Sequence, residues 1–366
     1  MTKKLEISAS KAPQIGPSQF QLLEQLCNAT AVSGDEHEVR QIVIEQVKLI
    51  ADDVKVDAMG NVLVTRFGRG ENRVRVMLAS HMDEIGFMIV KKHDDDLFQF
   101  ERVGGIDERQ LPGKAVLVGR DHLPGVIGAK PIHQTTTSER KKKIECSSLR
   151  IDLGPEIGDK VQPGDRATFA TRFEILGPSL RAKALDDRLG VATLIELLKY
   201  APPNIDLLAA FTVQEEVGLR GARVAAYHFN PDMAIAVDST PAYDLPTWDE
   251  EDQNTRYNTR LDAGPAIYVM DRGTIADRRL VKLLSRTGDE ESTPYQFRQP
   301  GGGGTDAGAI HLVRTGIPSV SVSVPSRYAH SAAGIARIDD WANTLRLLHA
   351  ALGRVTPDLL AGERRD

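Results

Sequence analysis

Four short apolar stretches of this chain each lead to side chains that can bind metal ions. The stretches cover residues 74–80, 207–213, 234–237 and 320–324, and the polar residues after them are His81 with Asp83, Glu215 with Glu216, Asp238, and His330. Because parallel strands end at one edge of a sheet, and open parallel sheets bind ligands there, we expect these side chains to lie close together. The sequence therefore predicts a metal centre at the carboxyl edge of a parallel sheet.

The adjacent acids Glu215 and Glu216 are the most informative pair. Two ionised carboxylates at the end of an apolar strand repel each other, unless a cation lies nearby or one of them holds a proton. Neighbouring residues also point in different directions, so one can bind a metal while the other acts as general base on a water. Taken alone, such a pair is more often a solvated loop edge, and only its combination with the other residues favours a site.

Asp186 and Asp187 form a second acidic pair, at the start of an apolar helical pattern. The helix dipole favours an acid at this position, and that structural explanation accounts well for Asp187. The presence of Asp186 would be explained if its carboxylate bridged two cations. In a strand, residues two apart share a face, so His81 can bind a metal while Asp83 accepts a hydrogen bond from its other ring nitrogen or steadies the group.

Five of these side chains supply a mixed set of nitrogen and oxygen donors: His81, Asp186, Glu216, Asp238 and His330. Such a set suits two zinc, cobalt or manganese ions better than calcium, which takes oxygen ligands. A pair of these ions polarises an amide carbonyl and supplies a nucleophile near neutral pH, so the predicted chemistry is hydrolysis. His133 is compatible with either a surface position or a contribution to the site.

The elements that position these residues are helices and short strands. Apolar residues at helical spacing predict helices over residues 19–30 and 35–51, and a hairpin of strands 54–56 and 61–65 follows. Between residues 84 and 181, short alternating strands separated by Pro-Gly and Gly-Pro turns predict a small β domain without a convincing helix. Strand and helix patterns then alternate again.

We therefore expect an α/β fold in which helices enclose a mixed, mainly parallel sheet, with a β domain inserted. The predicted parts are an N-terminal tail at 1–17, a catalytic domain at 18–83 and 182–356, the insertion at 84–181 and a C-terminal tail at 357–366. Since the insertion leaves the chain next to Asp83 and returns just before Asp186, its loops should overhang the site.

Composition excludes several other classes of protein. The net charge of −5 gives no general attraction to nucleic acid or to anionic membranes. The chain has two cysteines, Cys27 and Cys146, which cannot build a disulfide framework, so a reducing compartment fits. No apolar stretch is long enough for a membrane span, and the N-terminal residues lack the pattern of a secretory signal. We expect a cytoplasmic protein with neither nucleic-acid nor membrane partners.

Seven motifs, in order, resemble those of the tetrahedral dodecameric aminopeptidases, a co-catalytic metallopeptidase family that includes glutamyl and deblocking aminopeptidases and members labelled endoglucanases. The resemblance extends from about residue 20 to 355. The motifs are ASHMDEIG at 79–86, GAKPIH at 128–133, KALDDRLG at 183–190, VQEEVG at 213–218, VDST at 237–240, GGGTD at 302–306 and YAHS at 328–331. The polar N-terminal tail and an acidic loop at 248–254 stand apart as local additions.

The resemblance implies a role for each candidate residue. One ion would be held by His81, Asp186 and Asp238, and the other by Asp186, Glu216 and His330, with Glu215 as general base and Asp83 orienting His81. The resemblance also implies a zinc-exopeptidase-like catalytic domain, a cis peptide bond between Asp186 and Asp187, and a PDZ-like insertion that forms dimers. A dodecamer built from those dimers would follow.

The leading expectation is an aminopeptidase that removes N-terminal residues from short peptides. The first alternative is a metal-dependent deacylase acting on N-acyl amino acids, which would read a blocked end in place of a free amine. A glycosidase needs two carboxylates roughly 5–9.5 Å apart around a sugar bond. Glu215 and Glu216 do not offer that arrangement, and His81 would be unexplained. A non-catalytic binding or shell-forming protein would show no turnover.

Overall fold

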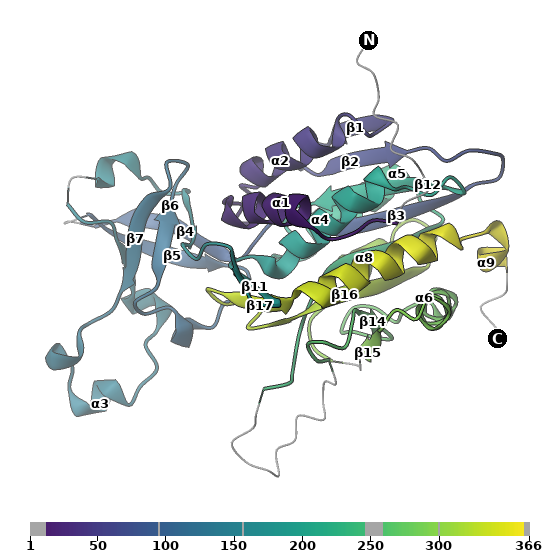
Figure 1. The fold of residues 1–366 in the computed structure, drawn as a ribbon. Coiled ribbons are helices and arrows are strands. Elements are labelled where there is room, and N and C mark those ends of the chain that lie inside the picture. The colour runs from purple at the N-terminus through teal and green to yellow at the C-terminus, as the bar shows by residue number, and fades with distance from the viewer. Residues whose placement is uncertain (1–11, 94–95, 156, 246–258, 299–300, 362–366) are drawn as a thin grey trace.

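The computed structural model describes residues 12–361, apart from residues 94–95, 156, 246–258 and 299–300. The acidic loop at 248–254 therefore lies outside the described residues. The fold combines a large mixed sheet, covered by helices, with a separate six-stranded barrel at one end of the molecule (Figure 1). Among the described helices, none is long and apolar enough to cross a membrane.

Four parallel strands form the centre of the large sheet, in the order β12, β3, β13, β16. Their bounds are β3 (Val74–His81), β12 (Ile205–Thr212), β13 (Met233–Pro241) and β16 (Ser319–Arg327). Nearly all of their residues are buried, as expected for parallel strands covered on both faces, which explains their continuous apolar sequences. Parallel pairing places Thr212 opposite His81 and Ser323 opposite Asp238, so the candidate ligands lie at the same edge.

The outer strands of this sheet pair mostly antiparallel, so the prediction of a mainly parallel sheet is right only at its centre. Strands joined by a short turn, such as those of the predicted hairpin, can pair only antiparallel, because parallel strands need a long crossover connection. For this reason the edge of the sheet is not parallel like its centre. These strands are β1 (Asp53–Val56), β2 (Val62–Arg66), β10 (Glu174–Leu176), β11 (Ser179–Ala182), β14 (Ala266–Tyr268), β15 (Gln296–Arg298) and β17 (Gly334–Arg337).

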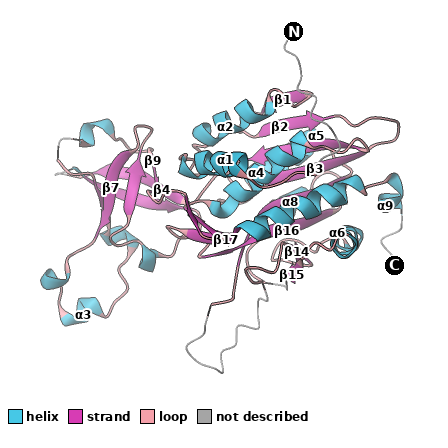
Figure 2. Ribbon diagram, in the orientation of Figure 1, coloured by secondary structure: helices cyan, strands magenta, loops and turns pink. Residues whose placement is uncertain are grey.

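Helices cover both faces of the sheet (Figure 2). On one face α4 (Leu185–Lys199) packs against β3 and β13, with α1 (Pro17–Asn28) and α8 (Ile338–Gly353) beside it. On the other face lie α5 (Arg220–Phe229) and α7 (Ala307–Ile310). The remaining helices of this domain are α2 (His37–Val47), α6 (Arg278–Glu290) and α9 (Pro357–Ala361). The range predicted as a C-terminal tail thus begins with α9.

The barrel closes in the order β4, β5, β8, β7, β6, β9 and has an apolar core of its own. In that core the ring of Phe87 lies 5.1 Å from Phe100 and 5.3 Å from Phe169, both edge-on. The strands are β4 (Gly86–Lys92), β5 (Leu97–Val103), β6 (Ala115–Val118), β7 (Leu123–Gly128), β8 (Arg150–Asp152) and β9 (Arg166–Phe169).

Two features differ from the expected insertion at 84–181. An arm of the barrel carries the short helix α3 (Thr137–Arg140) between single 3-10 turns, where no helix was expected. Strands β10 and β11 lie within the same range but pair with the large sheet through β17. The barrel itself therefore ends at β9, before the predicted return to the catalytic domain.

Candidate metal centre

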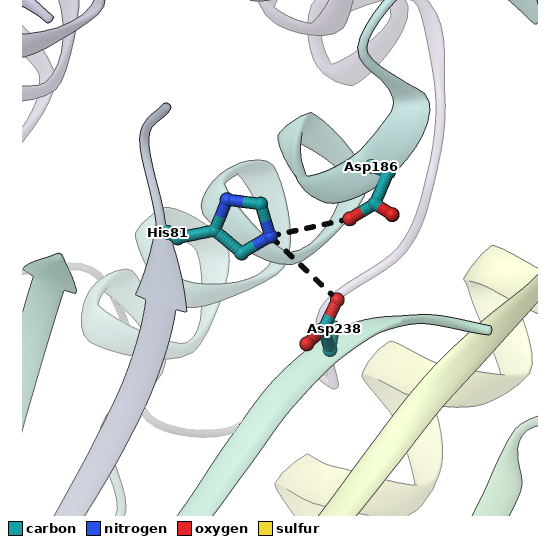
Figure 3. A group of neighbouring side chains, drawn as sticks. All are labelled: His81, Asp186 and Asp238. Atoms are coloured by element: carbon teal, nitrogen blue, oxygen red, sulfur yellow. Dashed lines mark hydrogen bonds and ion pairs between the residues drawn. The ribbon is translucent and has the colours of Figure 1, made fainter. Parts of the chain in front are cut away.

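His81, Asp186 and Asp238 form the first group of possible ligands (Figure 3). His81 ends β3, Asp238 lies in β13 next to it, and Asp186 stands at the first turn of α4. The Nε2 atom of His81 lies 3.2 Å from Oδ1 of Asp186 and 3.8 Å from Oδ1 of Asp238. All three reach one point, because the parallel strands and the helix N-terminus meet at the carboxyl edge of the sheet.

Asp186, Glu216 and His330 form the second group. The Nε2 atom of His330 lies 3.5 Å from Oδ2 of Asp186 and 3.3 Å from Oε2 of Glu216. Asp186 belongs to both groups, and its Oδ1 faces His81 while its Oδ2 faces His330. Within each group the donor atoms lie within 4.8 Å of one another, so the fold brings together all five ligands expected from the sequence.

The protonation of these groups shows that the site favours positive charge. Burial raises the pKa of Glu216 to about 8, although the imidazole of His330 beside it works in the opposite direction. Burial disfavours the charged form of His330, but the carboxylates of Asp186 and Glu216 outweigh it and raise its pKa to about 10. Protons thus occupy positions that divalent cations would take, and the mixed donor set fits two such ions.

Glu215 lies next to the ligands without belonging to either group. Burial raises the pKa of its carboxyl well above the usual range, and the nearby acids Asp238 and Asp306 act in the same direction. A carboxylate with a raised pKa is a stronger base, which suits proton transfer near neutral pH.

Asp83 holds the backbone of both neighbouring glutamates. Its Oδ1 accepts a hydrogen bond from the Glu215 amide at 3.0 Å, and its Oδ2 accepts from the Glu216 amide at 3.3 Å and from the Ser33 hydroxyl at 2.6 Å. Because these hydrogen bonds hold the Asp83 carboxylate, its Oδ1 lies 3.6 Å from Nδ1 of His81, which is too far for a hydrogen bond. The nearer partner of Nδ1, at 3.0 Å, is the backbone carbonyl of Asp83, which differs from the expected carboxylate contact.

The barrel also contributes to the centre. The carbonyl of Gly105 lies 3.0 Å from Nδ1 of His330, which fixes the orientation of that ring. A side chain at Gly104 would approach the Cβ atom of Glu216, so the loop after β5 passes close to this ligand. Loops of the insertion thus overhang the site, as its exit next to Asp83 indicates. His133 is exposed on the barrel arm and belongs to neither ligand group.

Two further acids are buried near the ligands. Asp187 accepts hydrogen bonds from Ser80 and from the amide of Gly190, which supports its structural explanation, and its peptide bond with Asp186 is cis, as the resemblance implies. Sequence reasoning assigned no role to Asp306, which accepts a hydrogen bond from Thr212 and whose pKa burial raises to about 7. The sequence signal that could have pointed to Asp306 is its position as the last residue of the GGGTD motif.

Acids and histidines gathered in two ligand groups at the carboxyl edge of an α/β sheet indicate a metal-dependent hydrolase. The chain belongs to the M42 glutamyl aminopeptidase family, whose model matches residues 60–347. A putative aminopeptidase of Acetivibrio thermocellus is 36% identical over 338 residues, which cover 91% of this chain and 98% of the relative.

Two solved structures share the fold over nearly the whole chain. The aminopeptidase APDkam598 of the archaeon Desulfurococcus kamchatkensis is 35% identical, with a TM-score of 0.87, and the match covers 94% of this chain and 96% of that one. The Pyrococcus horikoshii TET1 peptidase, described as assembling into a tetrahedron or a large octahedral shell, is 33% identical, with a TM-score of 0.80, over 92% and 100% of the two chains. The predicted family is thus confirmed.

Proposed function

We propose that this protein is a dinuclear metal-dependent aminopeptidase that removes N-terminal residues from short peptides. The observation that carries the proposal is the position of Asp186, whose two oxygens face two separate groups of ligands. Zinc fits the nitrogen and oxygen donors best, and cobalt or manganese are the alternatives. His81, Asp186 and Asp238 would hold one ion, and Asp186, Glu216 and His330 the other.

The residues of the chain divide the work of hydrolysis. When bound, the two ions supply Lewis acidity to the scissile carbonyl and to the attacking water. Glu215 removes a proton from that water and passes it to the leaving amine, a role that its raised pKa supports. The Asp83 carboxylate positions Glu215 by accepting a hydrogen bond from the Glu215 amide, and the carbonyl of Asp83 fixes the tautomer of His81 by accepting a hydrogen bond from Nδ1–H.

The assignment of base and ligand is tested by two substitutions. Glu215→Gln should keep both metal ions but lose most hydrolysis, by a factor of about 100 to 10,000, because the general base is gone. His330→Ala should lose metal as well as activity. Metal content by mass spectrometry and turnover of aminoacyl reporter substrates measure both effects. Parent-like activity in Glu215→Gln would remove this residue from the mechanism.

Metal removal and the choice of substrate test the class of reaction. Exhaustive chelation should abolish turnover, and adding back zinc, cobalt or manganese in turn should restore it to different extents. Peptides with a free N-terminal amine should be cleaved, and matched N-acylated peptides should not. Cleavage of only the acylated series would favour the deacylase, and full activity after chelation would contradict the metal scheme.

Assembly and compartment are parts of the same proposal. The insertion at 84–181 would be a PDZ-like dimerisation domain, and six dimers would form a dodecamer. The solved structure of PhTET1-12s, which is 34% identical to this chain and is described as a dodecamer, supports this assembly. Cys27 and Cys146 are both free and buried, which supports a reducing compartment such as the cytoplasm. Light scattering measures the mass of the assembly directly.

A further inference from the structure

A buried ion pair joins the segment that leads into the barrel to the segment that leads from the large sheet into α4. Glu84 precedes β4, where the chain enters the barrel, and Lys183 lies between β11 of the large sheet and α4. The Nζ atom of Lys183 lies 2.7 Å and 2.8 Å from the two oxygens of Glu84, and it also donates to the carbonyl of Ala29 at 2.6 Å. Both charged side chains are only 2% exposed.

The Glu84 carboxylate gathers hydrogen bonds from separate parts of the fold. Its Oε1 accepts from the amide of Ala31 at 2.9 Å, and its Oε2 accepts from the hydroxyl of Thr168, in barrel strand β9, at 2.9 Å. The guanidinium of Arg188, in α4, lies 3.4 Å from Oε1. The same carboxylate thus contacts the N-terminal segment, the barrel, Lys183 in the segment between β11 and α4, and the helix that carries Asp186.

Arg188 extends this network to the ligand His81. The guanidinium is fully buried and donates to the carbonyls of Met82 and Asp83, the latter at 3.3 Å. The Asp83 carbonyl is also the partner of Nδ1 of His81. Glu84 lies three residues after His81, and Lys183 lies three residues before Asp186, so the ion pair fixes the backbone next to one candidate ligand in each segment.

Stability alone does not explain charges at this place. A buried ion pair is often no more stabilising than apolar residues of the same size, because removing both charges from water costs so much free energy. An ionic network does impose one specific arrangement on the segments that it joins. The segments joined here are those next to His81 and Asp186, two of the three residues of the first ligand group.

We propose that Glu84 is a positioning residue of the metal centre: its buried carboxylate joins the chain segments next to His81 and Asp186 and, through Arg188 and Lys183, holds these two residues in the geometry that binds metal. The inference rests on the proposed function, because it assumes that these residues bind ions. It assigns Glu84 no contact with substrate.

The test compares Glu84→Gln with a matched control, Asp206→Asn. Asp206 is also a buried carboxylate, with Arg73 Nε at 2.7 Å and the Gly68 amide at 3.0 Å, but it lies at the start of β12, at the end of the strand away from the site. Glu84→Gln should weaken zinc binding about 10- to 100-fold, the range seen when groups that orient metal ligands are removed. Asp206→Asn should bind zinc as the parent does.

Zinc affinity is measured by competition with a chromogenic chelator, and the visible absorption bands of the cobalt-loaded proteins report the ligand geometry. Glu84→Gln should shift these bands, and Asp206→Asn should not. If Glu84→Gln does not fold, Lys183→Met takes its place, with zinc binding expected to weaken at least about threefold.

The outcomes separate the two proposals. Parent-like zinc affinity and cobalt bands in Glu84→Gln, or in Lys183→Met if that variant replaces it, would overturn the role of Glu84 while leaving the metal centre intact. A parent protein that binds no zinc or cobalt would overturn both. A loss of zinc affinity of the same size in Asp206→Asn would show a general loss of stability and would also overturn the positioning role.

Discussion

Asp186 shows how one residue can organise a site. Its two carboxylate oxygens lie 3.2 Å from His81 and 3.5 Å from His330, residues that come from different ends of the chain. Burial is the largest cause of the raised pKa values of Glu215, Glu216 and Asp238, and the neighbouring acids raise these pKa values further. Such a site should prefer cations over protons as the pH rises.

Zinc binding should therefore strengthen with increasing pH. In the metal-free protein, Glu216 with a pKa of about 8 and His330 with a pKa of about 10 both hold a proton at pH 7. Metal binding must displace these protons, so affinity should rise about tenfold per pH unit for each proton released. Competition titrations at pH 6, 7 and 8 measure the slope. A flat profile would contradict these protonation states.

The residues of the site could be predicted better than their contacts. His81, Asp238 and Glu216 follow apolar strands, and parallel pairing alone brings such strand ends together. The partner of His81 could not be predicted, because the Asp83 carboxylate is engaged by the amides of Glu215 and Glu216, more than a hundred residues away. Asp306 was missed for a similar reason, since its burial depends on Thr212 in another strand.

At the scale of elements, the loop between β12 and α5 is held at both of its ends by one side chain. Asn61 accepts a hydrogen bond from the Val213 amide at 3.0 Å and donates to the Gly221 carbonyl at 3.1 Å, so it fastens both ends of the segment that contains Glu215 and Glu216. A Cβ atom on Gly221 would overlap the Asn61 side chain and the backbone of Val213.

Gly221→Ala should therefore destabilise the protein although alanine favours helices. The overlap with buried backbone should cost roughly 1–3 kcal/mol. The control is Gly353→Ala at the end of α8, where an added Cβ atom meets no neighbour and the gain should be about 0.5–1 kcal/mol. Urea unfolding of the metal-free proteins measures both. Equal stabilities for the two variants would contradict this account of the loop.

Elements with a regular apolar pattern were predicted correctly, and the pairing of β10 and β11 with the large sheet was not. The helices near residues 19–30 and 35–51 and the first hairpin are present because their apolar spacing is regular over several turns or strand residues. Strands β10 and β11, of three and four residues, carry little pattern of their own. Strand β10 pairs with β11, and β11 pairs with β17, about 150 residues further along the chain, which no local signal records.

At the scale of the whole molecule, the barrel arm presents exposed apolar side chains. Ile132 is 69% exposed and Ile144 is 41% exposed, both on the segment around α3. Exposed apolar groups on a projecting arm are typical of a contact surface. The arm is therefore a candidate for contacts between subunits in the proposed dodecamer.

Ile132→Lys should reduce the mass of the assembly without unfolding the subunit, because a charge at the contact would be removed from water. Light scattering after size-exclusion chromatography measures the mass, and circular dichroism checks the fold. Phe67→Lys, which changes an exposed apolar residue of the catalytic domain, is the matched control and should leave the mass unchanged. An unaltered mass for Ile132→Lys would exclude this part of the arm from subunit contacts.

The order of the ligands along the chain has a consequence for biosynthesis. His81 emerges from the ribosome early, Asp186 only after the entire barrel, and His330 close to the end. A growing polypeptide therefore lacks a full set of donors until His330 has been made. Binding of both ions should follow the synthesis of His330, and truncated products that stop before this residue should hold fewer ions than the full chain.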